Sequence, residues 1–180
     1  MRDGARMPGS PPGTDQGVDT GLITDIGWAG CRKFGEELCG DQVVIHDRHG
    51  ASPVVVLADG LGSGVKACIL ATLTAKIIAT MIAKAMPLEE CVATVAATLP
   101  VCGVRKIAYA TFTIIRVTES REAEVIQYDN PGLILLRNGK HVDFPATPLE
   151  TGGKTILTST FALREGDTLI AVSDGALHAG

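Results

Sequence analysis

The chain has 180 residues, of which 46% are hydrophobic and 20% are charged, so it can bury one core and is too apolar to be intrinsically disordered. Its 16 basic residues are scattered and are outnumbered by 20 acidic ones, which gives a net charge of −4 and argues against nucleic-acid binding. Aromatic residues make up only 4%, so the core must be built from Val, Ile, Leu and Ala.

The ends and the cysteines of the chain bear on its location. Residues 1–17 are rich in Gly, Pro and polar residues and have no apolar stretch, which predicts a flexible tail rather than a signal peptide. We therefore expect one domain over residues 18–180. The five cysteines form no CxxC pair, which favours a reducing cytoplasm. The most apolar stretch, 65–86, is interrupted by three lysines, so we expect no membrane span.

Three strands are predicted at the start of the domain, at residues 21–34, Asp41–Asp47 and Ser52–Asp59. The third is a continuous apolar run, which is typical of a strand buried on both faces. A long helix follows the glycine-rich residues 60–64. Polar residues recur every fourth position along it, which predicts one narrow polar stripe and a helix covered on most sides. Pro87 then starts a second helix.

The rest of the chain has the two-residue period of strands. Asn138-Gly139 is a strong hairpin turn within it. Because strands and helices come in runs rather than in alternation, we expect an α+β fold with antiparallel sheets and helices on their outer faces. The predicted strands are Ile107–Val117, Glu122–Tyr128, Gly132–Arg137, Lys140–Phe144, Thr155–Leu163 and Asp167–Ser173.

Three aspartates stand beside glycine at the ends of predicted strands: Asp41, Asp59 and Asp174. A carboxylate at the end of an apolar strand is costly to bury unless a positive charge meets it. If the three strands are neighbours, the carboxylates repel one another, and a divalent cation relieves that repulsion. Oxygen ligands of this kind select Mg²⁺, Mn²⁺ or Ca²⁺ over zinc.

Two other interpretations of these residues compete with a metal site. An Asp-Gly pair after a strand is most often only a turn, and Asp174-Gly175 alone would fit that. Residues 60–64, GLGSG, also suggest a nucleotide-binding loop. However, they have neither the GxGxxG spacing nor the GK[ST] pair, and Asp59 would repel a phosphate.

The stretch VVVLADGLGSGVKA (Val54–Ala67) resembles the metal-site motif of PP2C-type serine/threonine phosphatases of the sporulation-stage-II-E branch, which includes the small stressosome-type phosphatases. The resemblance covers roughly residues 35–180. It implies an antiparallel β-sandwich flanked by helix pairs, in four layers. Further similar stretches occur in the same order, namely LCGDQVVI (Leu38–Ile45), AYATFTII (Ala108–Ile115), YDNPGLILLRNG (Tyr128–Gly139) and LIAVSDGALHAG (Leu169–Gly180).

The resemblance also implies roles for individual residues. Asp59 is similar to the carboxylate that bridges two Mn²⁺ or Mg²⁺ ions, and the carbonyl of Gly60 to a ligand of one of them. Asp174 is similar to a ligand of the other ion, and Asp41 to the acidic residue that acts through metal-bound water. Two cations would bridge and activate the attacking water. Asn130 falls in the family's Asn-Pro stretch, where a structural role is expected.

Two departures from the family pattern are visible. The best-known PP2C enzymes carry a histidine at the position of Leu61, and the sporulation branch commonly lacks it too. The general acid is therefore unidentified. The family's last metal aspartate lies beyond the SDG motif, so we expect either that the domain is truncated at its C-terminal end or that the site is incomplete. The histidines offer no clear substitute: His46, His49 and His141 are expected on the surface, and His178 lies near Asp174 in the chain.

The leading hypothesis is hydrolysis of phosphoserine or phosphothreonine on a regulatory protein of the anti-sigma-antagonist or stressosome type. The alternative is a phosphatase-like domain that binds protein partners without turnover, favoured by the missing last aspartate. A small-molecule hydrolase on the same metal framework is a third possibility. The substrate protein and the oligomeric state are left open by the sequence.

Overall fold

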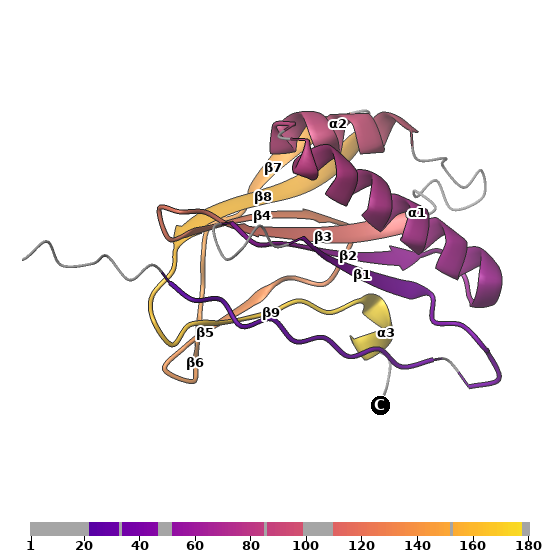
Figure 1. Cartoon of the computed structure of the whole chain (residues 1–180), viewed down its shortest axis with the longest axis horizontal. Helices are drawn as coiled ribbons and strands as arrows, with labels where there is room; N and C mark the ends of the chain where they lie inside the picture. The colour runs from indigo at the N-terminus through magenta and orange to yellow at the C-terminus, as the bar shows by residue number, and fades with distance from the viewer. Residues whose placement is uncertain are drawn as a thin grey trace, which may run out of the picture.

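A computed structural model describes residues 22–32, 34–46, 52–84, 86–98, 110–151 and 153–177 of the chain. In this part, a six-stranded and a three-stranded sheet lie face to face (Figure 1). Helices α1 (Gly64–Ala83) and α2 (Leu88–Thr98) cover the outer face of the larger sheet. The predicted α+β class with antiparallel sheets is confirmed. Three layers of the predicted four, one of helices and two of sheet, lie within the described residues.

The larger sheet has the strand order β1-β2-β3-β4-β8-β7, and every neighbouring pair is antiparallel. The central strands are buried on both faces, which is why they are built from Val, Ile and Phe. The strands are β1 (Asp41–His46), β2 (Val54–Gly60), β3 (Ala110–Val117), β4 (Glu122–Tyr128), β8 (Lys154–Ala162) and β7 (Thr147–Thr151).

The smaller sheet consists of β5 (Ile134–Arg137) between β6 (Lys140–Val142) and β9 (Thr168–Ile170). The predicted turn at Asn138-Gly139 joins β5 to β6, and both of its residues have positive φ, as a type I′ turn requires. After β9 the chain forms a single helical turn, α3 (Asp174–Leu177).

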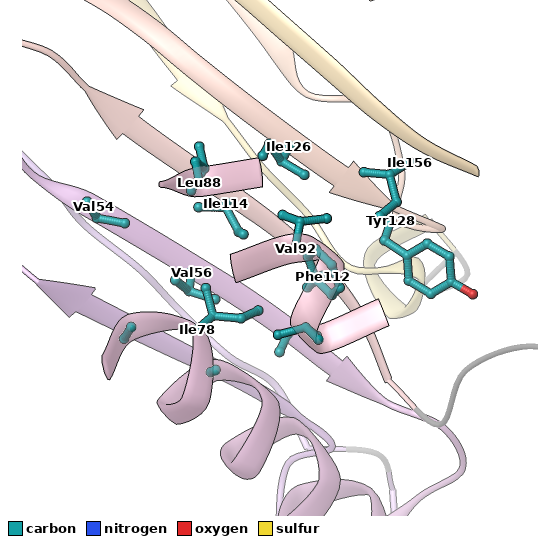
Figure 2. Close-up of a cluster of buried hydrophobic side chains, with 14 of the residues drawn as sticks. Val54, Val56, Ile78, Leu88, Val92, Phe112, Ile114, Ile126, Tyr128 and Ile156 are labelled. Atoms are coloured by element: carbon teal, nitrogen blue, oxygen red, sulfur yellow. The ribbon is translucent and has the colours of Figure 1, made fainter. Parts of the chain in front are cut away.

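One core fills the space between the helices and the larger sheet. Figure 2 shows Ile78 of α1 and Val92 of α2 facing the same side chains of β2, β3 and β4. The two-residue period of the strands puts alternate residues on this face, so β2 contributes Val54, Val56 and Ala58.

A second core lies between the two sheets. Ile115 of β3 and Val125 of β4 point away from the helices. They pack with Leu133, just before β5, and Leu169 of β9. Because β2 alternates in the same way, Asp59 is on the face of Val55 and away from the helices. The carboxylate of Asp59 therefore projects on the side of the smaller sheet.

Several strand predictions differ from the structure. Residues 22–32 belong to no strand, although 21–34 was predicted as one, because they form no ladder hydrogen bonds with the described strands. The predicted strand Asp167–Ser173 is shortened to β9. Strand β7 was not predicted because Pro148 interrupts it; as an edge strand it tolerates a proline.

Helix α1 is more exposed than predicted. Its buried residues follow one side, while Val65, Ile69 and Leu73 are more than half exposed (62%, 59% and 54%). By length and composition alone α1 could cross a membrane, but its other side contributes Ala71, Ala75 and Ile78 to the core. Its apolar character is therefore accounted for only in part by burial among the described residues.

Candidate active site

Asp41 and Asp59 lie directly opposite each other on the neighbouring strands β1 and β2. Residues in such antiparallel positions project from the same face of the sheet, with their Cβ atoms about 5 Å apart. Two carboxylates placed so closely repel each other unless one is protonated or a cation lies between them. The structure thus brings together two of the three aspartates singled out in the sequence.

Asp174 reaches the same place from the C-terminal part of the chain. It is the first residue of α3, which follows β9 of the smaller sheet (Figure 1). The preceding residue, Ser173, is buried and donates a hydrogen bond from its Oγ to Oδ2 of Asp41, at 2.8 Å. This bond ties the two sheets together beside the aspartates and places Asp174 next to Asp59.

The crowding of the three carboxylates changes the acidity of Asp59. Burial of its side chain, the charge of Asp41, and the hydrogen bond and charge of Asp174 raise the pKa of Asp59 from 3.8 to about 8. Each cause opposes the negative form of the carboxylate. A divalent cation would reverse the balance, because it favours the charged form of every carboxylate around it.

Gly60 follows Asp59 and is held without any space for a side chain. Its N–H donates to the carbonyl of Gly40 at 3.1 Å, and a Cβ on Gly60 would lie 2.0 Å from the carbonyl oxygen of Ala67 in the first turn of α1. Only glycine fits there. Gly62 and Gly64 then adopt positive φ (106° and 65°), so the chain turns from strand to helix within four residues.

The donor set fits a hard divalent cation in its chemistry, since it consists of carboxylates and a backbone carbonyl. Among the residues that the structure describes, however, no three His, Cys, Asp or Glu side chains converge as a ready set of ligands on one point. Asp41, Asp59 and Asp174 therefore form an acidic cluster that an ion would draw together.

The other residues considered in the sequence lie elsewhere or support the cluster. Asn130 donates to Oγ1 of Thr113 at 3.1 Å and accepts from Oγ1 of Thr111 at 2.6 Å, beside Asp59, so it braces β3 where Thr111 pairs with Asp59. His141 is exposed, whereas His46, at the far end of β1 from Asp41, is half-buried rather than on the surface as expected. His49 and His178 lie outside the described residues.

Two contacts at the site were not foreseen from the sequence. Ser173 was noted only as part of the S-D-G stretch, and its bond to Asp41 crosses 132 positions of the chain. Glu36 accepts a hydrogen bond from Ser63 at 2.7 Å, at the end of the glycine-rich loop. A single sequence contains no pattern that pairs residues so far apart.

Comparison with known proteins now identifies the relatives of this chain. The profile of the family described as Stage II sporulation protein E (SpoIIE) matches residues 50–180, which is more than half of the chain. The chain belongs to the SpoIIE family. The segment before residue 50, with Asp41, precedes the matched region. No curated protein sequence matches the chain significantly.

Solved structures show the fold of this SpoIIE-family chain. The PP2C phosphatase domain of SpoIIE from Bacillus subtilis, with a fragment of its regulatory domain, matches with a TM-score of 0.70 at 18% identity. RsbX in complex with magnesium matches at 0.62 and 21%, and the RsbU and RsbW domains of Rv1364c from Mycobacterium tuberculosis at 0.61 and 20%. These alignments cover 82%, 82% and 79% of this chain, and 44%, 72% and 41% of theirs. The chain thus has the PP2C phosphatase fold and spans less than half of two of these structures.

Proposed function

We propose that this SpoIIE-family chain is a metal-dependent protein phosphatase that hydrolyses phosphoserine or phosphothreonine on a regulatory protein. The observation that carries the proposal is the gathering of Asp41, Asp59 and Asp174 at one end of the sandwich, with the pKa of Asp59 raised to about 8. The negative charges of such a cluster repel one another, and bound divalent cations would relieve this repulsion. Family membership supports the assignment of the reaction.

Each aspartate of the cluster, and Gly60, would have its own role. Asp59, the Gly60 carbonyl and Asp174 would hold two Mn²⁺ or Mg²⁺ ions, which supply a nucleophilic water and neutralise phosphoryl charge when bound. Asp41, fixed by the hydroxyl of Ser173 at Oδ2, would orient the attacking water through its other carboxylate oxygen. Hydrolysis by such a water would require no covalent intermediate on the protein.

The nature of the substrate is inferred from similar structures. One is RsbX in complex with magnesium, another contains RsbU and RsbW domains, and a third comes from work on the bacterial stressosome. We infer a phosphorylated regulatory protein of that kind as the partner. A cytoplasmic location is in keeping with the free thiols of Cys31, Cys39 and Cys68.

The test is release of phosphate from a phosphoserine-containing regulatory protein and from p-nitrophenyl phosphate, in Mn²⁺ and in EDTA. We expect release that requires Mn²⁺ and falls by at least about 100-fold in Asp59→Asn and Asp174→Asn, since loss of a metal ligand removes the main source of charge stabilisation. The matched control is Asp143→Asn, whose side chain is 99% exposed.

Release that persists in EDTA, or that is equal in Asp59→Asn and wild type, would contradict the proposal. Binding of the phosphoprotein without any turnover would instead support a phosphatase-like binding domain.

A further inference from the structure

Glu36 contacts the end of the glycine-rich loop from a distant part of the chain. Its Oε1 accepts a hydrogen bond from the hydroxyl of Ser63 at 2.7 Å. Its Oε2 lies so near Gly64 that a Cβ on this glycine would be only 2.5 Å away. Both carboxylate oxygens therefore face the last two residues of the loop, where α1 begins.

The N-terminus of α1 has particular need of this carboxylate. The first residues of a helix have unpaired N–H groups and a partial positive charge, which acidic residues normally neutralise. The first turn of α1 contains no acidic residue, and among the described residues Ser63 makes no capping bond with its side chain. The hydroxyl of Ser63 is used by Glu36 instead, so the negative charge comes from 27 positions upstream.

The segment that contains Glu36 also holds the beginning of the loop. Four residues later, the carbonyl of Gly40 accepts the N–H of Gly60 at 3.1 Å, and Asp41 pairs with Asp59. Residues 36–41 thus contact the loop at both of its ends. The carbonyl of Ala67, in the first turn of α1, lies close to Gly60, so a shift of the start of α1 would displace Gly60.

We propose that Glu36 is a positioning residue for the metal-binding loop: by anchoring Ser63 and the start of α1, it holds the Gly60 carbonyl and the Asp59 carboxylate in place for a divalent cation. This inference rests on the proposed function. Glu36 itself precedes the region matched by the family profile, residues 50–180, whereas the loop that it contacts lies within that region.

The experiment compares Glu36→Ala, Glu36→Gln and Ser63→Ala with Glu37→Ala, a matched control at the adjacent position. Hydrogen exchange of residues 61–67 is measured on the metal-free protein, and Mn²⁺ binding is measured by calorimetry. We expect Glu36→Ala to speed exchange there on the order of tenfold, as for loss of a helix cap. Its Mn²⁺ affinity should fall about tenfold, as for other residues that orient metal ligands. Glu36→Gln keeps the hydrogen bond and should recover part of both losses, while Glu37→Ala should match wild type.

Equal exchange in Glu36→Ala and Glu37→Ala would overturn the proposal, and so would faster exchange with unchanged Mn²⁺ affinity. If the wild-type chain itself binds no Mn²⁺, the proposed function and this inference both fail. If wild type binds Mn²⁺ and Glu36→Ala binds it equally well, the function stands and only the positioning role is lost.

Discussion

Asp59 combines a position dictated by the sequence with an environment dictated by the fold. It ends an apolar strand and precedes Gly60, as predicted, and it lies opposite Asp41 because β1 and β2 pair in register. Its raised pKa has three physical sources, namely burial, Asp41 and Asp174. Burial and the two neighbouring carboxylates also favour a bound cation at Asp59. The metal-free protein therefore has an electrostatic cost, and the proposed metal site would explain it.

The first prediction concerns the stability of the metal-free protein. Between about pH 4 and pH 8, folded Asp59 keeps a proton that the unfolded chain loses, so this group lowers the free energy of unfolding as pH rises through that range. Asp59→Asn removes the penalty. After allowance for partial exposure, we expect it to raise the melting temperature by a few degrees at pH 8, about 1 kcal/mol, and to have little effect at pH 4.

Thermal unfolding of both proteins in EDTA from pH 4 to pH 9 measures this difference. Asp143→Asn, at an exposed position, should show no such dependence. A difference between Asp59→Asn and wild type that stays constant with pH would contradict the pKa assigned to Asp59.

At the scale of elements, an ion pair joins the central strand of the smaller sheet, β5, to the start of its edge strand β9. Arg137, at the end of β5, donates from Nε and Nη2 to the two carboxylate oxygens of Asp167, at 2.8 and 2.6 Å, just before β9. The side chain of Asp167 is only 3% exposed. These hydrogen bonds hold the pKa of Asp167 below its usual value. Because β9 leads into Ser173 and Asp174, the pair supports the cluster indirectly.

We therefore predict that Asp167→Ala lowers the free energy of unfolding by about 1 to 2 kcal/mol at neutral pH, because it breaks charge-assisted hydrogen bonds. The loss should shrink as pH falls below the ordinary carboxyl pKa of 3.8, because the unfolded chain then takes up a proton that folded Asp167, with its lowered pKa, still resists. Urea unfolding at pH 7 and pH 3 provides the measurement. Asp143→Ala is the control, and an equal loss in both variants would show that the pair is not structural.

An element could be predicted from the sequence when the residues that determine it lie within a few positions of one another. Helices α1 and α2 and the central strands followed from apolar patterning and from Pro87, which act within a few residues. Strand β7 depends on β8 for its hydrogen bonds, and Pro148 hid it. Residues 22–32 have the composition of a strand but no strand among the described residues pairs with them, so they remain irregular.

The same distinction between local patterns and long-range contacts applies to the site. Asp41, Asp59 and Asp174 could be singled out because an acidic residue beside glycine at the end of a strand is a local pattern. Their meeting depends on the register of β1 with β2 and on the return of the chain after β9, which no local pattern specifies. Glu36 and Ser173 were missed for that reason.

At the scale of the whole molecule, two cores on opposite faces of one sheet hold the aspartates at its end. The first joins α1 and α2 to the larger sheet, and the second joins the two sheets (Figures 1 and 2). The site lies on the side of the second core and opposite the helices. Its geometry nevertheless depends on the first core, because α1 begins directly at the loop that carries Gly60.

Two adjacent isoleucines of α1 test how this helix packs on the larger sheet. Ile78 is 1% exposed within the first core, whereas Ile77 is 36% exposed. Ile78→Ala should cost about 3 kcal/mol of unfolding free energy through the cavity that it leaves, and Ile77→Ala well under half of that. Urea unfolding of the two variants gives the comparison. Similar costs would mean that α1 packs on the sheet by a different side.

The most direct test of the central claim is a calorimetric titration of the wild-type chain and Asp59→Asn with Mn²⁺ at pH 7. The account predicts that wild type binds Mn²⁺ with release of a proton, because Asp59 is largely protonated below its pKa of about 8 and must ionise to bind. Asp59→Asn should bind at least about tenfold more weakly and release no proton. Equal binding by both proteins, or none by wild type, would contradict the account.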